Sequence, residues 1–514
     1  MERPGNRFSR IPLLNNPFLL IPFIAGFSFL LYANALRGDF VLDDKFQVVR
    51  NMWIRDFGNV RLALGSHFWG FYGESANYYR PFIWVIHTLG YRLFWLEPYG
   101  YHLINVLFHA ACSVLVFLIA QRVLERKEAA ASRIPLAASL LFAAHPVHTE
   151  GVAWISAVSE LSFSFFFLLA FYFHLKGKEE RGMRGLSLAL SLVSFAVSLF
   201  SKESAVMFPF IILAYASLLE RERLPVALKR SAPYLLIAGF YLILRFSLME
   251  GVSAGTGHDE IGPWEMLINI GPIFTKGMEK LLIPLNLNAF YTFHVKNIFE
   301  PREFFSIGIL ALFSLLVLFS IKKDRAIAFG LLFMFLTLMP AFYIKGIITN
   351  TFAERYLYLP SAGFLLSATL FARNLLRKKF LFPVFIILLL SFYSWGTISR
   401  NPAWRDDLAI LSDMVEKNPE AGFAHYLLAN ELLERGRPRE SVREYELAAR
   451  SYPEDALLHN NMGLAYARAG MREEALREFR TALSLSPDME EAKGNMLSLM
   501  GGRLEQDSLR DSAP

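Results

Sequence analysis

Ionisable residues gather in short groups at the ends of long apolar runs. The first group is Asp43-Asp44, which follows the first apolar run. An acidic pair there could accept the proton of an acceptor hydroxyl, or ligate a divalent cation through carboxylate oxygens. Because adjacent carboxylates repel each other, one of them binds a proton more readily than a lone aspartate. Asp43 and Asp44 are therefore candidates for a catalytic base, with a solvated loop pair as the alternative.

A second group lies between the third and fourth apolar runs. His145, His148, Glu150 and Glu160 place two imidazoles and two carboxylates within sixteen residues that lack Lys and Arg. Such a group could work as an acid–base cluster or as a metal site, although its spacing does not match a zinc signature. Helix-end residues that hydrogen-bond only to one another are the alternative.

Cationic residues mark the remaining groups. Lys202, followed by Glu203, could meet a phosphate as a point charge. Arg355, followed by Tyr356, could hold a phosphate with two parallel hydrogen bonds, and Arg80 is a similar candidate. A local Lys–Glu pair, and arginines that snorkel beside tyrosines at a membrane surface, would explain the same residues without a ligand.

The composition points to a membrane bundle that positions these groups. The 514 residues are 54% hydrophobic and 19% charged, whereas a soluble globular protein is about 45–50% apolar and about 25% charged. A single soluble enzyme domain and extensive disorder are both excluded. A membrane helix needs about 20 mostly apolar residues. Eleven predicted spans come close to this length: 18–36, 101–121, 134–148, 156–175, 184–200, 204–219, 231–248, 303–321, 326–344, 356–373 and 381–398.

Charge in the loops predicts the orientation of the bundle. Lys and Arg favour the cytoplasmic side of a membrane. With residue 1 in the cytoplasm, six predicted inner loops hold 22 Lys and Arg: 1–17, 122–133, 176–184, 220–230, 322–325 and 373–379. The loops 37–100 and 249–302 and the C-terminal tail then lie outside. Two polar segments inside these loops, 80–95 and 264–284, are interpreted as interfacial helices.

The composition changes near residue 402, which divides the chain into 1–401 and 402–514. Pro419, Pro453 and Pro487 recur every 34 residues, the period of a tetratricopeptide (TPR) repeat. The second unit also carries in-register residues at Gly463, Tyr466, Ala475, Phe479 and Ala482. Residues 405–417 are predicted as a preceding half-repeat, and residues 490–500 as a capping helix. The predicted fold is therefore all-α: a polytopic membrane helix bundle followed by a short TPR solenoid.

The formal net charge of +6 combines two opposed parts. Residues 1–401 carry +13 and residues 402–514 carry −7. The basic residues orient the membrane part, so we expect no nucleic acid partner. Acids, imidazoles and cations on one side suit a reaction between a phosphate-linked membrane lipid and a hydroxyl acceptor.

The order of these motifs resembles a known family. An Asp-Asp pair, Tyr-Arg-Pro, His-Leu-Ile-Asn, His-Pro-Val-His-Thr-Glu, Ser-Lys-Glu-Ser and Glu-Arg-Tyr-Leu-Tyr-Leu-Pro-Ser precede C-terminal TPRs. This order is similar to that of the transmembrane-and-TPR (TMTC) protein O-mannosyltransferases, within the GT-C glycosyltransferases. The resemblance covers almost the whole chain, and the small number of TPR units favours a bacterial member.

The resemblance implies an inverting glycosyltransferase. Its donor would be a monosaccharide on polyprenyl or dolichyl phosphate, and its acceptor a protein Ser/Thr hydroxyl or a similar group. The acidic residue of the first outer loop maps onto Asp43 or Asp44, and a second one onto Glu160, where the basic residue of the family's context is missing. His145, His148, Glu150, Arg80, Lys202, Glu203, Arg355 and Tyr356 would contact the substrates. The expected location is the bacterial inner membrane, or the endoplasmic reticulum in a eukaryote.

Partners follow from the same interpretation. The TPR groove would hold the acceptor protein or peptide on the periplasmic or luminal side. No cofactor is required beyond the donor, although a divalent cation at Asp43 and Asp44 is compatible with the pattern. Two alternatives stay open: a non-catalytic TPR membrane scaffold, and a polymerase, ligase or flippase of lipid-linked glycans.

Overall fold

A computed structural model gives the structure of the chain. It describes residues 17–73, 78–124, 133–179, 183–249, 263–291, 301–343, 352–376, 378 and 380–501. The backbone divides into two compact units. The first comprises residues 1–287 and 293–405, and the second comprises residues 288–292 and 406–514.

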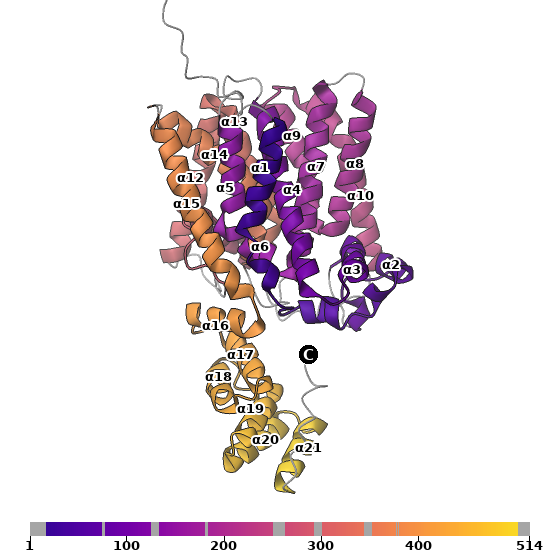
Figure 1. The fold of residues 1–514 in the computed structure, drawn as a ribbon, viewed down its shortest axis with the longest axis vertical. Helices are drawn as coiled ribbons and strands as arrows, with labels where there is room; N and C mark the ends of the chain where they lie inside the picture. Colours follow the sequence, from indigo (N-terminus) through magenta and orange to yellow (C-terminus); the bar gives the residue numbers. More distant parts are fainter. Residues whose placement is uncertain are drawn as a thin grey trace, which may run out of the picture. The chain divides into compact units, whose positions relative to one another are not determined.

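The first unit is a bundle of upright helices, drawn from indigo to orange in Figure 1. The upright helices are α1 (Pro17–Leu31), α4 (Pro98–Leu124), α5 (Ile134–Ala144), α7 (Val158–Glu179), α8 (Arg184–Ser201), α9 (Phe208–Leu218), α10 (Leu224–Leu248), α12 (Pro301–Lys323), α13 (Arg325–Leu338), α14 (Tyr358–Leu375) and α15 (Leu381–Arg400). The first unit also contains α11 (Pro263–Leu282). Seven segments in the described residues are long and apolar enough to cross a membrane, and they correspond to α4, α7, α8, α10, α12, α13 and α15. The prediction of an all-α membrane bundle is confirmed, whereas the number of eleven spans stays a prediction.

Several helices are shorter than the apolar runs predict. The run 134–148 is helical only to Ala144, because Pro146 lacks the backbone N–H that a continuing helix would need. The run 204–219 begins with a 3₁₀ turn, Glu203–Met207, before α9 starts at Phe208. These breaks place irregular backbone at one end of the bundle, where polar side chains can converge.

Short helices cover that end of the bundle. They are α2 (Val60–Leu64), α3 (Pro81–Phe94) and α6 (Thr149–Ala153), and Figure 1 shows α2 and α3 at its lower edge. Pro81 opens α3, a position where the missing N–H costs nothing. Neither α3 nor α11 is among the seven segments that could span a membrane, and their placement at its surface stays a prediction.

Small residues bring two helices of the bundle into close contact. A side chain carbon added at Gly330 of α13 would lie 2.6 Å from the carbonyl oxygen of Gly363 in α14. Such close approach between small residues is the usual way in which membrane helices gain packing energy. This contact fixes α14, whose first turn follows the segment that carries Arg355.

The second unit contains the helical repeats. Its helices are α16 (Asp407–Lys417), α17 (Gly422–Glu434), α18 (Pro438–Ser451), α19 (Ala456–Arg468), α20 (Arg472–Leu485) and α21 (Glu490–Met500). The predicted half-repeat and capping helix are confirmed as α16 and α21. Gly436 and Gly470, with φ of 71° and 82°, turn the chain within each repeat.

Equivalent contacts recur 34 residues apart. His425 Nδ1 lies 2.6 Å from Glu444 Oε2, and His459 Nδ1 lies 2.7 Å from Glu478 Oε2. Phe479 is fully buried in the core of the repeats, and Gly463 lies against its ring, as the repeat pattern predicts. The TPR register read from the proline spacing is therefore correct.

Candidate functional site

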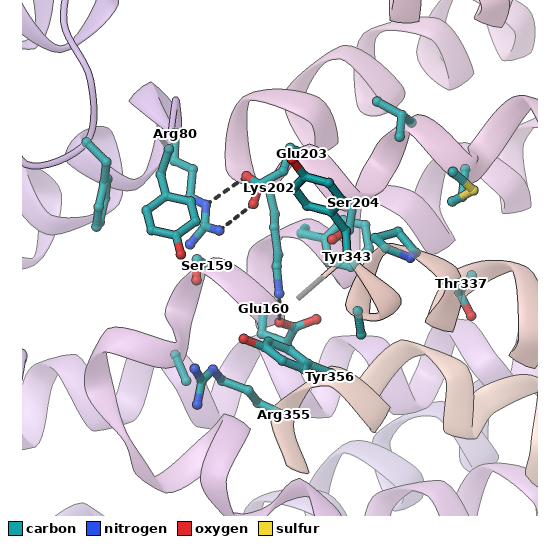
Figure 2. A pocket seen from close by; sticks show the side chains of 18 of the residues that line it. Arg80, Ser159, Glu160, Lys202, Glu203, Ser204, Thr337, Tyr343, Arg355 and Tyr356 are labelled. Carbon is teal, nitrogen blue, oxygen red and sulfur yellow. Dashed lines mark hydrogen bonds and ion pairs between the residues drawn. The ribbon is translucent and has the colours of Figure 1, made fainter. Parts of the chain in front are cut away.

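One cavity in the first unit collects most of the predicted site residues. Its volume is about 720 Å³. Seven of the predicted residues line it: Asp43, Arg80, Glu160, Lys202, Glu203, Arg355 and Tyr356. Figure 2 shows Lys202 and Glu160 between Arg80 and Glu203 on one side and Arg355 on the other. Segments more than 300 residues apart in sequence thus meet at one end of the bundle.

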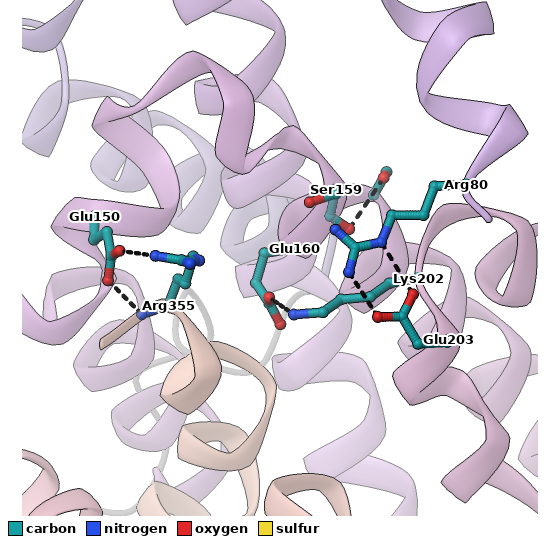
Figure 3. A network of polar contacts seen from close by, with 8 residues as sticks. Arg80, Glu150, Ser159, Glu160, Lys202, Glu203 and Arg355 are labelled. Atoms are coloured by element: carbon teal, nitrogen blue, oxygen red, sulfur yellow. Dashed lines mark hydrogen bonds and ion pairs between the residues drawn. The ribbon is translucent and has the colours of Figure 1, made fainter. Parts of the chain in front are cut away.

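Two ion pairs lie in the wall of the cavity (Figure 3). Arg80 donates two parallel hydrogen bonds to Glu203, from Nε to Oε2 at 3.0 Å and from a terminal nitrogen to Oε1 at 2.6 Å. Lys202 forms an ion pair with Glu160, and both side chains are buried. Because a buried cation needs a partner, the two acids hold these cations in the cavity wall.

A third ion pair joins Arg355 to Glu150, which lies outside the cavity lining. The guanidinium of Arg355 pairs with Glu150, and the backbone N–H of Arg355 donates to Glu150 Oε2 at 2.8 Å. Glu150 is 1% exposed and is not among the residues that line the cavity. Its carboxylate therefore fixes both the backbone and the side chain of Arg355.

The ends of regular elements set these side chains. Arg80 precedes Pro81 at the start of α3, and Glu160 lies in the first turn of α7, where the helix dipole favours a negative charge. Lys202 directly follows Ser201, the last residue of α8, and Arg355 lies in the 3₁₀ turn Glu354–Leu357. The cavity therefore lies at the ends of several helices. In the sequence, the Lys- and Arg-rich stretch 176–184 joins the opposite ends of α7 and α8.

The three cations also form cation–π contacts with aromatic rings. Lys202 Nζ lies 4.9 Å from the centre of the Tyr356 ring, and Arg355 Cζ lies 5.1 Å from the same ring. Arg80 Cζ lies 4.5 Å from the Tyr78 ring. Cation–π contacts of this length attract the cation without neutralising it. Each of the three cations thus contacts an aromatic ring as well as its acidic partner.

A sharp turn precedes the acidic pair. Leu42 has φ of 50°, a left-handed conformation that costs a residue with a side chain about 1–2 kcal/mol. After this turn, Asp43 lines the cavity, whereas Asp44 is fully buried. Asp44 accepts hydrogen bonds from the backbone N–H of Val41 at 3.0 Å and of Ser156 at 2.7 Å, and from the Ser156 hydroxyl.

Burial affects the pKa of both carboxyl groups. Burial raises the pKa of Asp44 to about 8; the hydrogen bonds from Ser156 and Val41 lower it, and the charge of Asp43 adds to the rise. Burial also raises the pKa of Asp43 above 3.8, and the Arg355 cation opposes this rise. Within this pair, Asp43 is the carboxyl that lines the cavity.

The two predicted histidines lie inside the bundle and do not line the cavity. His148 Nε2 lies 2.8 Å from the Ser361 hydroxyl, and His145 Nε2 lies 3.1 Å from the carbonyl oxygen of Leu281. Within the described residues, no group of three or more His, Cys, Asp and Glu is arranged to hold a metal ion. The predicted imidazole cluster is thus part of the helix packing in this structure.

Other residues of the site escaped the sequence patterns. Arg245 of α10 and Ser159 line the cavity, and Ser156 both lines it and bonds Asp44. Arg245 lies near the end of a predicted span, where burying an ionisable residue costs free energy. This position could have marked Arg245 as a candidate site residue. The two serines gave no signal in one sequence.

Comparison with known proteins identifies the relatives. A protein O-mannosyl-transferase of Caenorhabditis elegans, F38B6.6, is 26% identical over 452 residues, which are 86% of this chain and 64% of the relative. Human protein O-mannosyl-transferase TMTC1 is 25% identical over 499 residues, covering 86% of this chain and 56% of that protein. The homologues of the present chain are TMTC-family protein O-mannosyltransferases. Human TMTC3 is also similar, with 24% identity over 513 residues, 91% of this chain and 55% of that protein.

The C-terminal part agrees with these relatives. The tetratricopeptide repeat family matches residues 456–489, which span α19 and α20. No solved structure matches the chain. The chain spans between about half and two thirds of the length of the TMTC relatives named above. These relatives are animal proteins, so they do not bear out the expectation of a bacterial member. Together with the seven apolar helices, they indicate a multi-pass membrane protein.

Proposed function

We propose that this chain is a membrane glycosyltransferase that moves mannose or another monosaccharide from polyprenyl phosphate to a Ser/Thr hydroxyl of a protein. The observation that carries the proposal is the shared cavity, in which Asp43 lies with Arg80, Lys202 and Arg355. A carboxylate and several cations in one cavity match the two demands of this transfer: a proton acceptor, and stabilisation of a departing phosphate. The names of the relatives support the same reaction class.

The donor would occupy the cationic side of the cavity. A guanidinium has five N–H donors, and Glu203 takes up two of those of Arg80. The remaining donors of Arg80 and those of Arg355 can meet phosphate oxygens, while Lys202 supplies a point charge. Apolar residues of the same cavity, Phe163, Met207, Leu242, Phe246 and Met339, provide a surface for the isoprenoid tail.

The acceptor hydroxyl would approach Asp43. Its oxygen attacks the anomeric carbon of the sugar, its proton passes to Asp43, and the bond from that carbon to the phosphate oxygen breaks. The polyprenyl phosphate leaves with its charge balanced by Arg80, Lys202 and Arg355. One displacement inverts the anomeric configuration, and no covalent enzyme intermediate is needed. Glu160 takes the role of a positioning acid, because it pairs with Lys202.

The orientation and the repeats complete the proposal. The cavity faces the periplasm or lumen, because the Lys- and Arg-rich stretch 176–184, which joins the opposite ends of α7 and α8 in the sequence, favours the cytoplasm. The TPR helices hold an extended segment of the acceptor protein. A divalent cation at Asp43 is compatible with this scheme, but the scheme does not require one.

Comparative glycoproteomics tests the proposal. Cells that lack the protein are complemented with the wild type, with Asp43→Asn, or with Asp56→Asn. Asp56 lies in the same loop, is exposed and accepts a hydrogen bond from Gly58 that asparagine can also accept. We expect one class of glycosylated peptides to disappear in the null and Asp43→Asn cells, and to persist with the wild type and Asp56→Asn.

Two outcomes contradict the proposal. If the null cells lose no glycan, the chain is not a transferase under those conditions. If Asp43→Asn restores the glycan fully, the chain supports another enzyme as a scaffold, or Asp43 is not the base. Equal expression of the variants is verified on the same membranes.

A further inference from the structure

The last segment of the first unit packs against the candidate site. A 3₁₀ turn, Asn401–Trp404, follows α15, and Arg405 is the last residue of this unit. Trp404 is 2% exposed. Its ring stacks on that of Trp154, with the centres 5.7 Å apart and the planes inclined by 20°. Trp404 is therefore buried against a residue of the cavity wall.

Trp154 in turn contacts both functional parts of the cavity. Arg355 Cζ lies 5.2 Å from the centre of the Trp154 ring. The indole N–H of Trp154 donates to the carbonyl oxygen of Val41 at 3.4 Å, two residues before Asp43. One indole ring thus touches the cation proposed for the phosphate and the loop that carries the proposed base.

Hydrogen bonds tie the same terminal segment to the start of that loop. The backbone N–H of Asp39 donates to the carbonyl oxygen of Arg405 at 2.8 Å. The side chain amide of Asn401 donates to Leu31 O at 3.0 Å and to Asn34 Oδ1 at 2.7 Å. These bonds fix the path of the chain from α1 towards Asp43.

We propose that Trp404 is a positioning residue of the transferase site, acting through Trp154 on Arg355 and on the Asp43 loop. The inference rests on the proposed function, and it adds a role for the segment from which the chain continues into the repeats. Removing the Trp404 ring would allow the Trp154 ring to shift. Arg355 would then lose its cation–π contact with Trp154. A displacement of about 1 Å at a reacting group can lower the rate on the order of 10²-fold.

The test uses the full-length protein reconstituted in lipid nanodiscs. The variants are Trp404→Ala and Trp404→Phe, and the control is Trp395→Ala, a tryptophan of α15 that is 66% exposed. The probes are mannosyl phosphoryl polyprenol and an acceptor protein found by the glycoproteomics above. We expect kcat/KM to fall about 10²-fold in Trp404→Ala. We expect a fall of about 3-fold to 10-fold in Trp404→Phe, whose ring keeps part of the stacking surface. Trp395→Ala should match the wild type.

A double-mutant cycle separates positioning from general damage. In an Arg355→Lys background, Trp404→Ala should lower log(kcat/KM) by less than half as much as it does in the wild type. The reason is that both changes affect the same group. Fully additive losses, or equal kcat/KM for Trp404→Ala and Trp395→Ala, would overturn the inference. If Trp404→Ala does not fold, Trp404→Phe carries the test, and unchanged kcat/KM in that variant overturns it. A wild type without transfer activity would instead contradict the proposed function.

Discussion

The ion pair between Glu150 and Arg355 should make a large contribution to the stability of the site. Glu150 is 1% exposed, and it accepts from both the backbone N–H and the guanidinium of Arg355. Glu150→Ala leaves the Arg355 cation without this partner. Loss of one member of a buried pair costs about 3–5 kcal/mol. Because Arg355 is 23% exposed, water screens part of its charge, and we expect a value near the lower end of that range.

The pair can be removed stepwise. Glu150→Gln keeps an oxygen for the backbone N–H of Arg355 but loses the charge, at a cost of about 1.5–3 kcal/mol. The neutral double variant Glu150→Gln/Arg355→Gln buries no unpaired charge. Its cost should therefore be at least about 1 kcal/mol smaller than the sum of the two single variants.

Reversible unfolding in mixed detergent micelles measures these differences. The free energy of unfolding is compared for the wild type, the two single glutamine variants and the double variant. Two results would refute the reasoning: a Glu150→Gln protein as stable as the wild type, or costs that simply add in the double variant. Either result would mean that Glu150 and Arg355 do not depend on each other in the folded protein.

Three further predictions concern the base, the bundle and the repeats. Because burial raises the pKa of Asp43 above 3.8 and a base must be ionised, transfer should be lost as pH falls through this raised pKa. Arg355→Gln should move that limb of the pH–rate profile to higher pH, since the cation lowers the pKa of Asp43; an unmoved limb would count against the pairing. Gly363→Ala should destabilise the bundle by about 1–3 kcal/mol through overpacking against α13, whereas Gly308→Ala, with no atom near the added carbon, should not. Phe479→Ala should cost about 3–5 kcal/mol, seen as faster proteolysis between α19 and α20, and unchanged cleavage would contradict the buried packing of this ring.

The fold class and the repeat register could be predicted because they rest on periodic signals. Apolar runs report the membrane helices, and Pro453 and Pro487 mark the repeat ends by their 34-residue spacing. The ends of the membrane helices were less predictable. A hydrophobic run does not show where backbone hydrogen bonding changes, as in α5, which ends at Ala144, two residues before Pro146.

The site could be predicted as a set of residue types, but the division of roles could not. Glu150 and Arg355 are 205 residues apart, and no spacing rule relates them. Asp43 and Asp44 are neighbours in sequence, yet Asp43 lines the cavity whereas Asp44 is buried against Val41 and Ser156. Such roles depend on tertiary contacts, which a single sequence does not contain.

The most direct test of the central claim compares Asp43→Asn with Asp44→Asn in single-turnover sugar transfer. Both proteins are reconstituted in nanodiscs with a polyprenyl-phosphate monosaccharide and an identified acceptor. Asp43→Asn should fold and bind the donor but transfer the sugar about 10²–10⁴-fold more slowly, because the proton acceptor is gone. Asp44→Asn keeps an oxygen for the two Ser156 donors but loses the acceptor of the Val41 N–H. Because Asp44 does not line the cavity, transfer should fall less than about tenfold. Full transfer by Asp43→Asn, or the reverse order of the two variants, would contradict the account.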